Sequence, residues 1–130
     1  MTGYFGSIEQ ETEKNNYFRK VIYTGKHLQV VVMCLQGGEE IGNEVHQEVD
    51  QFFRIEQGGA KFILNNHEEH VIQQGDAAVV PAGTWHNVIN LSQSTQLKLY
   101  TIYTPPQHPD GTIHKTKAEA EAAEAAEHHH

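Results

Sequence analysis

The chain has little of three things that would point to common classes of protein: cysteine, positive charge and long apolar runs. Its one cysteine, Cys34, cannot form a disulfide within the chain, so we expect a reducing compartment. Lysine and arginine total 9 against 17 aspartates and glutamates, a net charge of −8. That balance argues against nucleic acid or an anionic membrane as a partner. The longest aliphatic run, residues 30–35, is too short to span a bilayer.

Residues 1–13 also lack the basic segment and apolar stretch that mark a secretion signal. Together with the single cysteine, this predicts a cytoplasmic protein. A length of 130 residues suggests one domain. The chain after Lys117 contains only alanine, glutamate and histidine, and the final histidines, 128–130, read as natural sequence or as the remnant of an expression tag. We assign those three histidines no role in a site.

Short apolar stretches separated by glycine- and asparagine-containing turns predict many strands, at residues 17–23, 28–35, 52–55, 60–64, 70–72, 77–80, 96–104 and from 85 onward. Such a pattern is typical of an antiparallel barrel or sandwich. We expect a polar N-terminal arm (1–16), a barrel domain (17–106) and a C-terminal tail (107–130). In the tail, a capping box at Thr116 and Glu119 opens a short Ala/Glu helix. That helix has no large apolar residue, so we expect it to fray or stay solvated.

The last strand, residues 96–104, alternates along its length, and its lysine decides which face points inward. Lys98 should avoid the interior, which predicts an inner face of Leu97, Leu99, Thr101 and Tyr103. Tyr100 and Ile102 then lie on the outer face, where apolar groups favour a cover. With the apolar strand at 17–23, this predicts a homodimer through sheet packing.

Two segments carry polar residues that such strands would hold in place. In the later one, Pro81 ends a short strand and Gly83 supplies a turn conformation that other residues resist, so His86 begins the next strand on a rigid support. In the earlier one, Glu44 and His46 are two residues apart and share a face of an extended chain. From its own segment, His86 reads equally as a metal ligand and as a surface histidine at a hairpin end.

Together the two segments resemble the paired motifs of the cupin superfamily. The later one matches every defined position, at Gly75, Pro81, Gly83, His86 and Asn90. The earlier one keeps the spacing, at Gly38, Glu44, His46, Gln51 and Gly58, but has Glu44 where the family usually has histidine and Gln51 where it usually has glutamate. The resemblance covers roughly residues 18–104 and is to small single-domain bacterial cupins, in particular the mannose-6-phosphate isomerase-like branch. It implies an all-β fold, an antiparallel cupin or jelly-roll β-barrel.

The resemblance also implies one divalent metal ion in the barrel, held by Glu44, His46, Gln51 and His86. Two imidazoles and one carboxylate match the ligand types of non-haem iron sites, and manganese, nickel or zinc would also be accepted. Gln51 offers only a neutral amide oxygen. Because both replaced positions still carry a donor oxygen, we favour a metal site over a barrel that has lost one.

Several functions remain open at this point. The first is a small-molecule enzyme, either a metal dioxygenase or a sugar or keto isomerase. The second is a non-catalytic module or sensor subunit that binds a small organic ligand, and the third is a purely structural barrel. A sugar phosphate requires a cation, and Arg54 and Lys61 are the basic residues near the motif strands, which weakens the phosphosugar hypothesis.

The walls of the expected pocket are apolar and aromatic, as is typical of small-molecule sites. The candidates are Met33, Phe53, Phe62, Trp85, Leu99 and Tyr103, and each of them also reads as a core residue. The proline-rich segment 105–111 should run over the surface. We expect His108 and His114 beside it to be exposed to solvent.

Overall fold

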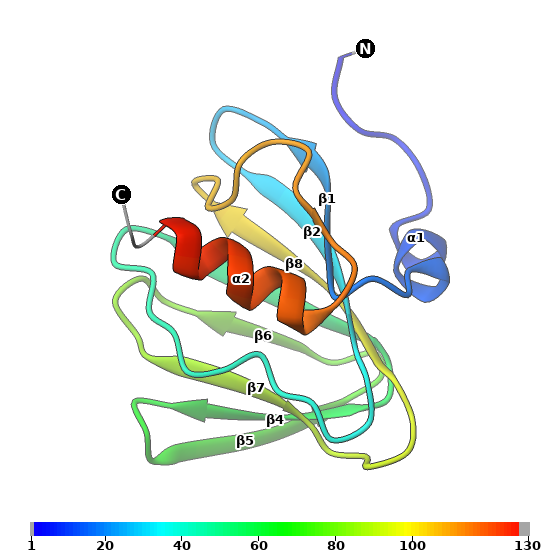
Figure 1. The fold of residues 1–130 in the computed structure, drawn as a ribbon, viewed down its shortest axis with the longest axis vertical. Helices are drawn as coiled ribbons and strands as arrows, with labels where there is room; N and C mark the ends of the chain where they lie inside the picture. The colour runs from blue at the N-terminus through cyan, green and yellow to red at the C-terminus, as the bar shows by residue number, and fades with distance from the viewer. Residues whose placement is uncertain (1, 128–130) are drawn as a thin grey trace.

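The computed structural model describes residues 2–127. It shows two antiparallel sheets folded over one another, with one helix near each end of the chain and outside the sheets (Figure 1). The helices are α1 (Ile8–Lys14) and α2 (Lys117–Glu127). The strands are β1 (Arg19–Thr24), β2 (Gln29–Leu35), β3 (Asp50–Gln57), β4 (Gly59–Leu64), β5 (Glu68–Gln73), β6 (Ala77–Val80), β7 (His86–Asn90), β8 (Leu97–Thr104) and β9 (Ile113–His114). The predicted all-β antiparallel barrel with a C-terminal helix is therefore confirmed.

The strands form two layers. The larger sheet has the order β6-β3-β8-β2-β1-β9 and the smaller one β5-β4-β7. Every pairing within them is antiparallel. Each predicted strand corresponds to an observed one, with ends displaced by a few residues. The short strand β9 and helix α1 were not predicted.

The core lies between the two sheets and explains the inward faces of the strands. The predicted inner face of β8 is confirmed, because Leu97, Leu99, Thr101 and Tyr103 are all buried. The rings of Phe53 on β3 and Phe62 on β4 meet edge to face with centroids 5.0 Å apart, so one aromatic pair joins the larger sheet to the smaller. In β2 nearly every residue is buried, including Cys34, because the sheet there is covered on both faces.

The N-terminal arm covers the outer face of β8 at Lys98, so this lysine is buried although it avoids the interior between the two sheets as expected. Lys98 is only 6% exposed, and its ammonium donates to the carbonyl of Glu13 and to Oδ1 of Asn16. The arm can do this because it contains helix α1, whose N-cap Ser7 accepts from the amide of Gln10. A buried lysine is tolerated where its protons meet fixed acceptors.

The C-terminal helix packs on the barrel, which corrects the expectation that it would fray or stay solvated. Its capping box forms as predicted: Thr116 accepts from the amide of Glu119, and the Glu119 carboxylate accepts from the amide of Lys115. Ala120 is buried in the main core cluster. A small side chain is what lets the helix approach the sheet closely. The final histidines, 128–130, which read as natural sequence or as a tag remnant, lie outside the described residues.

The segment before α2 is held against the barrel rather than running free over the surface. The buried amide of Gln29 accepts from the backbone amides of Gln107 and His108 and donates to the carbonyl of His108. Strand β9 then pairs with β1 through Arg19 and His114. The expectation that His108 and His114 are solvent-exposed is wrong, because both are half-buried where this segment crosses the barrel.

No helix within residues 2–127 combines the length and the apolar character that crossing a membrane requires.

Candidate metal centre

The turn before β7 positions His86 much as its sequence predicts. Gly83 has a φ of 80°, a conformation that side chains disfavour, and its amide donates to the carbonyl of His46 at 2.9 Å. The turn is thereby tied to the other motif segment. His86 follows as the first residue of β7 and is buried.

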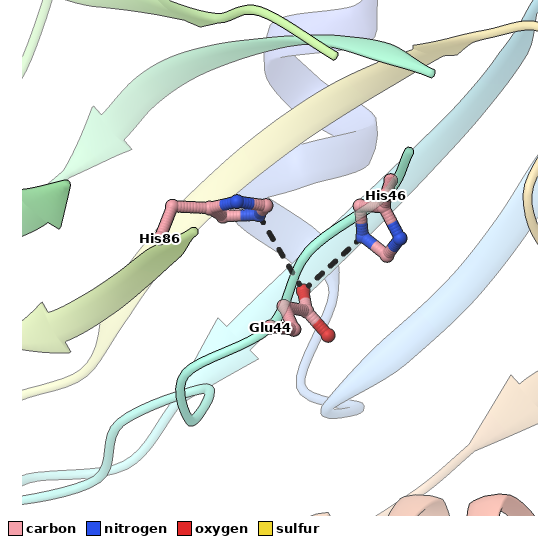
Figure 2. Close-up of side chains that lie close together, drawn as sticks. All are labelled: Glu44, His46 and His86. Carbon is pink, nitrogen blue, oxygen red and sulfur yellow. Dashed lines mark ion pairs between the residues drawn. The ribbon is translucent and has the colours of Figure 1, made fainter. Parts of the chain in front are cut away.

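Backbone pairing brings the two motif segments together. The amide of Glu44 donates to the carbonyl of His86, and the amide of His86 donates to the carbonyl of Glu44, both at 2.9 Å. Residues that exchange both bonds lie directly opposite each other and project their side chains to the same face. His46, two residues beyond Glu44, shares that face. Figure 2 shows the Glu44 carboxylate between the two imidazoles.

The three side chains are close enough to share one ion. Ligand atoms of Glu44, His46 and His86 all lie within 4.8 Å of one another. Oε1 of Glu44 is 3.5 Å from Nε2 of His46 and 3.8 Å from Nε2 of His86 (Figure 2). The two imidazole centroids are 5.5 Å apart. Both Nε2 atoms therefore approach the same carboxylate oxygen.

The hydrogen bond on the far side of His86 determines which of its nitrogens is available. Nδ1 of His86 lies 3.0 Å from the carbonyl oxygen of Thr84. A carbonyl only accepts, so Nδ1 carries the proton and Nε2 keeps its lone pair. A backbone carbonyl that orients a histidine in this way is the usual support for a metal ligand.

If these residues hold an ion, the atoms that point toward it should have no other hydrogen-bond partner. Nε2 of His46, Nε2 of His86 and Oε1 of Gln51 are all buried and have no hydrogen-bond partner within the described chain. Buried polar atoms are normally satisfied, because desolvation without a partner is costly. Three of the four predicted ligands thus have a buried lone-pair atom without a hydrogen-bond partner, as expected of residues that bind a cation.

The orientation of the Gln51 amide follows from its neighbour. The hydroxyl of Thr101 donates its single proton to the carbonyl of Phe52 at 2.8 Å, so it can only accept from Gln51. Nε2 of Gln51 is therefore the atom 2.9 Å from that hydroxyl. Oε1 is left as the available donor atom of Gln51.

Electrostatics favour the metal-binding forms of Glu44 and His86. Burial acts to raise the pKa of the Glu44 carboxyl, but His46, Arg19 and His86 outweigh it and hold that pKa below its ordinary value. Burial lowers the pKa of His86, and the Thr84 carbonyl and Glu44 offset this only in part. The site accordingly presents one anion and a neutral imidazole at His86 near neutral pH.

Two of the candidate ligands, Glu44 and His46, line a cavity of about 640 Å³. Its lining includes Arg19, Glu44, His46, His108, His114 and Glu124. Residues of α2 and of the loop before β9 also line this cavity. It is therefore polar, unlike the apolar pocket expected from the sequence.

Two cavity residues were missed by reasoning from sequence. Arg19 was overlooked because only basic residues near the motif strands were considered. Arg19 lies on β1, away from those strands in sequence, and lines the cavity together with residues of β9 and α2. Its signal was a single arginine in the largely apolar stretch 17–23. His108 was assigned to solvent, but Nε2 of His108 lies 3.3 Å from the hydroxyl of Tyr103. Burial, followed by the charge of Arg19, lowers the pKa of His108 to about 3.

The predicted pocket walls separate into two groups. Met33, Phe53, Phe62, Leu99 and Tyr103 are members of the buried core, and none of them lines the large cavity. Two of these rings still border the ligands: Tyr103 is 5.8 Å from the His46 imidazole and Phe53 is 6.2 Å from that of His86. Trp85 is 44% exposed.

The asparagine that closes the later motif has a structural role. Nδ2 of Asn90 donates to the carbonyls of Leu35, Gln36 and Thr95. Its Oδ1 accepts from the amide of Ser92. One buried side chain thus ties the end of β2 to the loop between β7 and β8, so this residue shapes the barrel rather than the ion site.

Two facing antiparallel sheets with a His/carboxylate cluster at one end define the class of small double-stranded β-helix barrels. A family model described as "Cupin domain" matches residues 31–103, so the chain belongs to the cupin family.

Similar proteins agree with this assignment. The protein YrkC of Bacillus subtilis is 52% identical over 123 residues, which cover 91% of this chain and 66% of that protein. The protein L612 of Acanthamoeba polyphaga mimivirus is 46% identical over 112 residues, covering 85% of this chain and 70% of that protein. The crystal structure of BH2720 from Bacillus halodurans is 47% identical with a TM-score of 0.89, over 92% of this chain and 93% of that one.

Proposed function

We propose that this cupin binds one divalent metal ion through Glu44, His46 and His86, with Gln51 as a fourth donor, and transforms a small organic molecule in the adjoining cavity. The observation that carries the proposal is the pair of buried, unpartnered imidazole nitrogens of His46 and His86 that converge on one oxygen of the Glu44 carboxylate. Iron, manganese, nickel and zinc all accept these ligand types. The ion, when bound, would supply a Lewis acid and open coordination positions for a chelating substrate.

The residues of the chain would orient that substrate and limit its contact with water. His46 and His86 are held by the turn at Gly83 and by the Thr84 carbonyl, so their lone pairs are fixed before anything binds. Helix α2 and the loop carrying His108 contribute part of the cavity wall. A substrate larger than the cavity of about 640 Å³ would not fit beside the ligands.

Two enzyme classes remain, and the cavity favours an oxygenase over an isomerase. Two histidines with one carboxylate are the ligand set of non-haem iron oxygenases. An isomerase also needs a group that accepts a proton from the substrate. His108 is a weak base, since its pKa is lowered to about 3. The mannose-6-phosphate isomerase-like branch remains a prediction.

The second candidate is a non-catalytic module that binds the same kind of small ligand. It is favoured by the departures from the usual family ligands at Glu44 and Gln51. A homodimer through the outer face around Tyr100 and Ile102 and a cytoplasmic location are further parts of the proposal, which rest on the sequence pattern alone. Gel filtration with light scattering tests the dimer.

The deciding experiment is metal analysis of the untagged protein followed by oxygen uptake. We expect mass spectrometry to find close to one iron, manganese, nickel or zinc ion per chain. Oxygen consumption in an electrode should then depend on a chelating substrate such as a catechol, a flavonol or a 2-oxo acid. Metal without substrate-dependent oxygen uptake favours the binding module, and a chain that takes up no ion after supplementation refutes the metal site.

A further inference from the structure

Arg19 is a cation in an unusual position. It begins β1 and is only 2% exposed, yet it lines the cavity next to the candidate ligands. Its Nε is buried and has no hydrogen-bond partner within the described residues. A guanidinium is almost never buried without an anion, because its donors then lack acceptors. Some acceptor is therefore expected to reach Arg19 from the cavity.

The only anion in contact with Arg19 in the described chain comes from the C-terminal helix, and the contact is loose. Nη1 of Arg19 is 3.5 Å from Oε1 of Glu124, whose side chain is 47% exposed. Nη1 is also 3.4 Å from Nδ1 of His114. A single long ion pair from a half-exposed side chain is weak, whereas arginine and a carboxylate at best form two short parallel hydrogen bonds. A second anion entering the cavity could therefore replace the Glu124 carboxylate beside Arg19.

We propose that the cavity binds a small organic acid whose carboxylate pairs with Arg19 in place of Glu124, while the rest of the molecule faces Glu44, His46 and His86. This inference names the substrate class of the proposed function and rests on it. The C-terminal helix then acts as a built-in competitor, since its carboxylate occupies the anion position until the acid arrives.

The charges of the site favour a carboxylate over a phosphate ester. Arg19 is the one arginine or lysine among the described cavity residues, and Glu44 and Glu124 lie in the same cavity. A divalent ion would leave this set with a single positive charge, which one carboxylate neutralises. A phosphate dianion would meet an excess of negative charge and would have only one guanidinium to hold it.

The test measures binding of pyruvate to the metal-loaded protein by isothermal titration calorimetry, with pyruvamide as the uncharged analogue and inorganic phosphate as the competing anion. The variants are Arg19→Lys, Glu124→Gln and Glu121→Gln. Glu121 is the matched control, because it lies one turn earlier on the same helix and pairs with Lys117 instead of Arg19. Metal content is measured on every sample.

We expect pyruvate to bind at least tenfold more tightly than pyruvamide or phosphate. Glu124→Gln should tighten pyruvate binding about three- to fivefold, because a half-exposed competitor is removed, while Glu121→Gln changes it less than twofold. Arg19→Lys should weaken pyruvate binding about tenfold with the ion retained, because lysine cannot form the two-point contact.

Unchanged pyruvate affinity in Arg19→Lys, or tighter binding of phosphate than of pyruvate, would overturn the substrate class. Equal effects of Glu124→Gln and Glu121→Gln would overturn the competition by the helix. If Arg19→Lys does not fold, the comparison of the two helix variants decides, since both changes lie on the surface. If the wild-type protein holds no ion yet shows these same shifts, the proposed metal site fails and the acid site stands.

Discussion

Within residues 2–127, two places gather three possible metal ligands whose ligand atoms lie within 4.8 Å of one another, and the two clusters differ in burial and in charge. One is the cluster of Glu44, His46 and His86 at the mouth of the cavity. The other, on α1 and β3, consists of Glu9, Glu13 and Glu56. Two carboxylates of the second cluster are exposed, and the third is 3.0 Å from the guanidinium of Arg54.

The difference shows that proximity alone does not make a site. In the second cluster, the two exposed carboxylates are hydrated and the third is paired with an arginine. An ion would have to displace these partners, which already satisfy the carboxylates. In the first cluster, the inward nitrogens of His46 and His86 are shielded from water and have no hydrogen-bond partner. Because folding has already removed water from these two nitrogens, a cation that binds them gains contacts without further loss of their hydration.

The largest effect should come from removing ligands in one cluster and not the other. Glu44→Ala and His86→Ala should each weaken metal binding by about 100-fold or more, because a ligand contributes more than the supporting contacts around it. Glu13→Ala removes a carboxylate from the second cluster and should change metal affinity less than twofold. Competition with a chelator, followed by mass spectrometry, measures the affinities.

Circular dichroism controls for folding, since the sheets of the barrel should survive these truncations. Retention of the ion in both Glu44→Ala and His86→Ala would sink the assignment of ligands. Loss of the ion in Glu13→Ala alone would move the site to the second cluster.

A smaller effect should distinguish the fourth donor from a merely buried amide. Gln51→Ala should weaken metal binding about tenfold, and Gln51→Glu should strengthen it, because a charged oxygen replaces a neutral one. Gln51→Glu should also lower the free energy of unfolding of the metal-free protein by about 1–2 kcal/mol, because Thr101 has no proton left to donate to a carboxylate. Chelator competition and urea unfolding give the two quantities. Equal metal affinity in all three proteins would show that Gln51 is structural.

The smallest expected effect is on the pH dependence of the free energy of unfolding. It compares the half-buried His108 with the exposed carboxylates of the second cluster. The pKa of His108 is about 3 in the folded chain against about 6.5 unfolded, so folding favours the neutral ring. Its contribution is fully present above about pH 6.5 and is lost as pH falls toward 3. The charged and titratable groups that act on it are Arg19, Glu44, His46 and His114.

In the metal-free protein, His108→Gln should make the loss of stability between pH 6.5 and 4 shallower, by up to about 1 kcal/mol per pH unit. Glu13→Gln, in the exposed cluster, is the control and should leave the slope unchanged over most of that range. Urea unfolding at several pH values measures this. A slope for His108→Gln that equals the wild-type slope would mean that His108 is already accessible to protons.

Much of the fold and of the cluster could be predicted because it depends on local chemistry. The turn at Pro81 and Gly83 needs a restricted φ and a positive φ, and only those residue types supply them easily. Alternation along β8 identified its buried face correctly. Lys98 lies on the outer face of β8 as expected, but its burial could not be predicted: whether a lysine is buried depends on which acceptors another segment brings to it, and α1 is distant in sequence.

The sequence by itself determined the strands, the rigid turn before His86 and the pairing of Glu44 with His46 on one face, since each follows from spacing and backbone preference within a few residues. Only the tertiary structure decided that the Glu44 and His86 backbones pair directly, that Gln29 draws the loop of His108 onto the barrel, and that Arg19 faces Glu124 across the cavity. Those contacts join residues that are tens of positions apart. Their geometry depends on how the two sheets close over a shared core, and no local pattern records that closure.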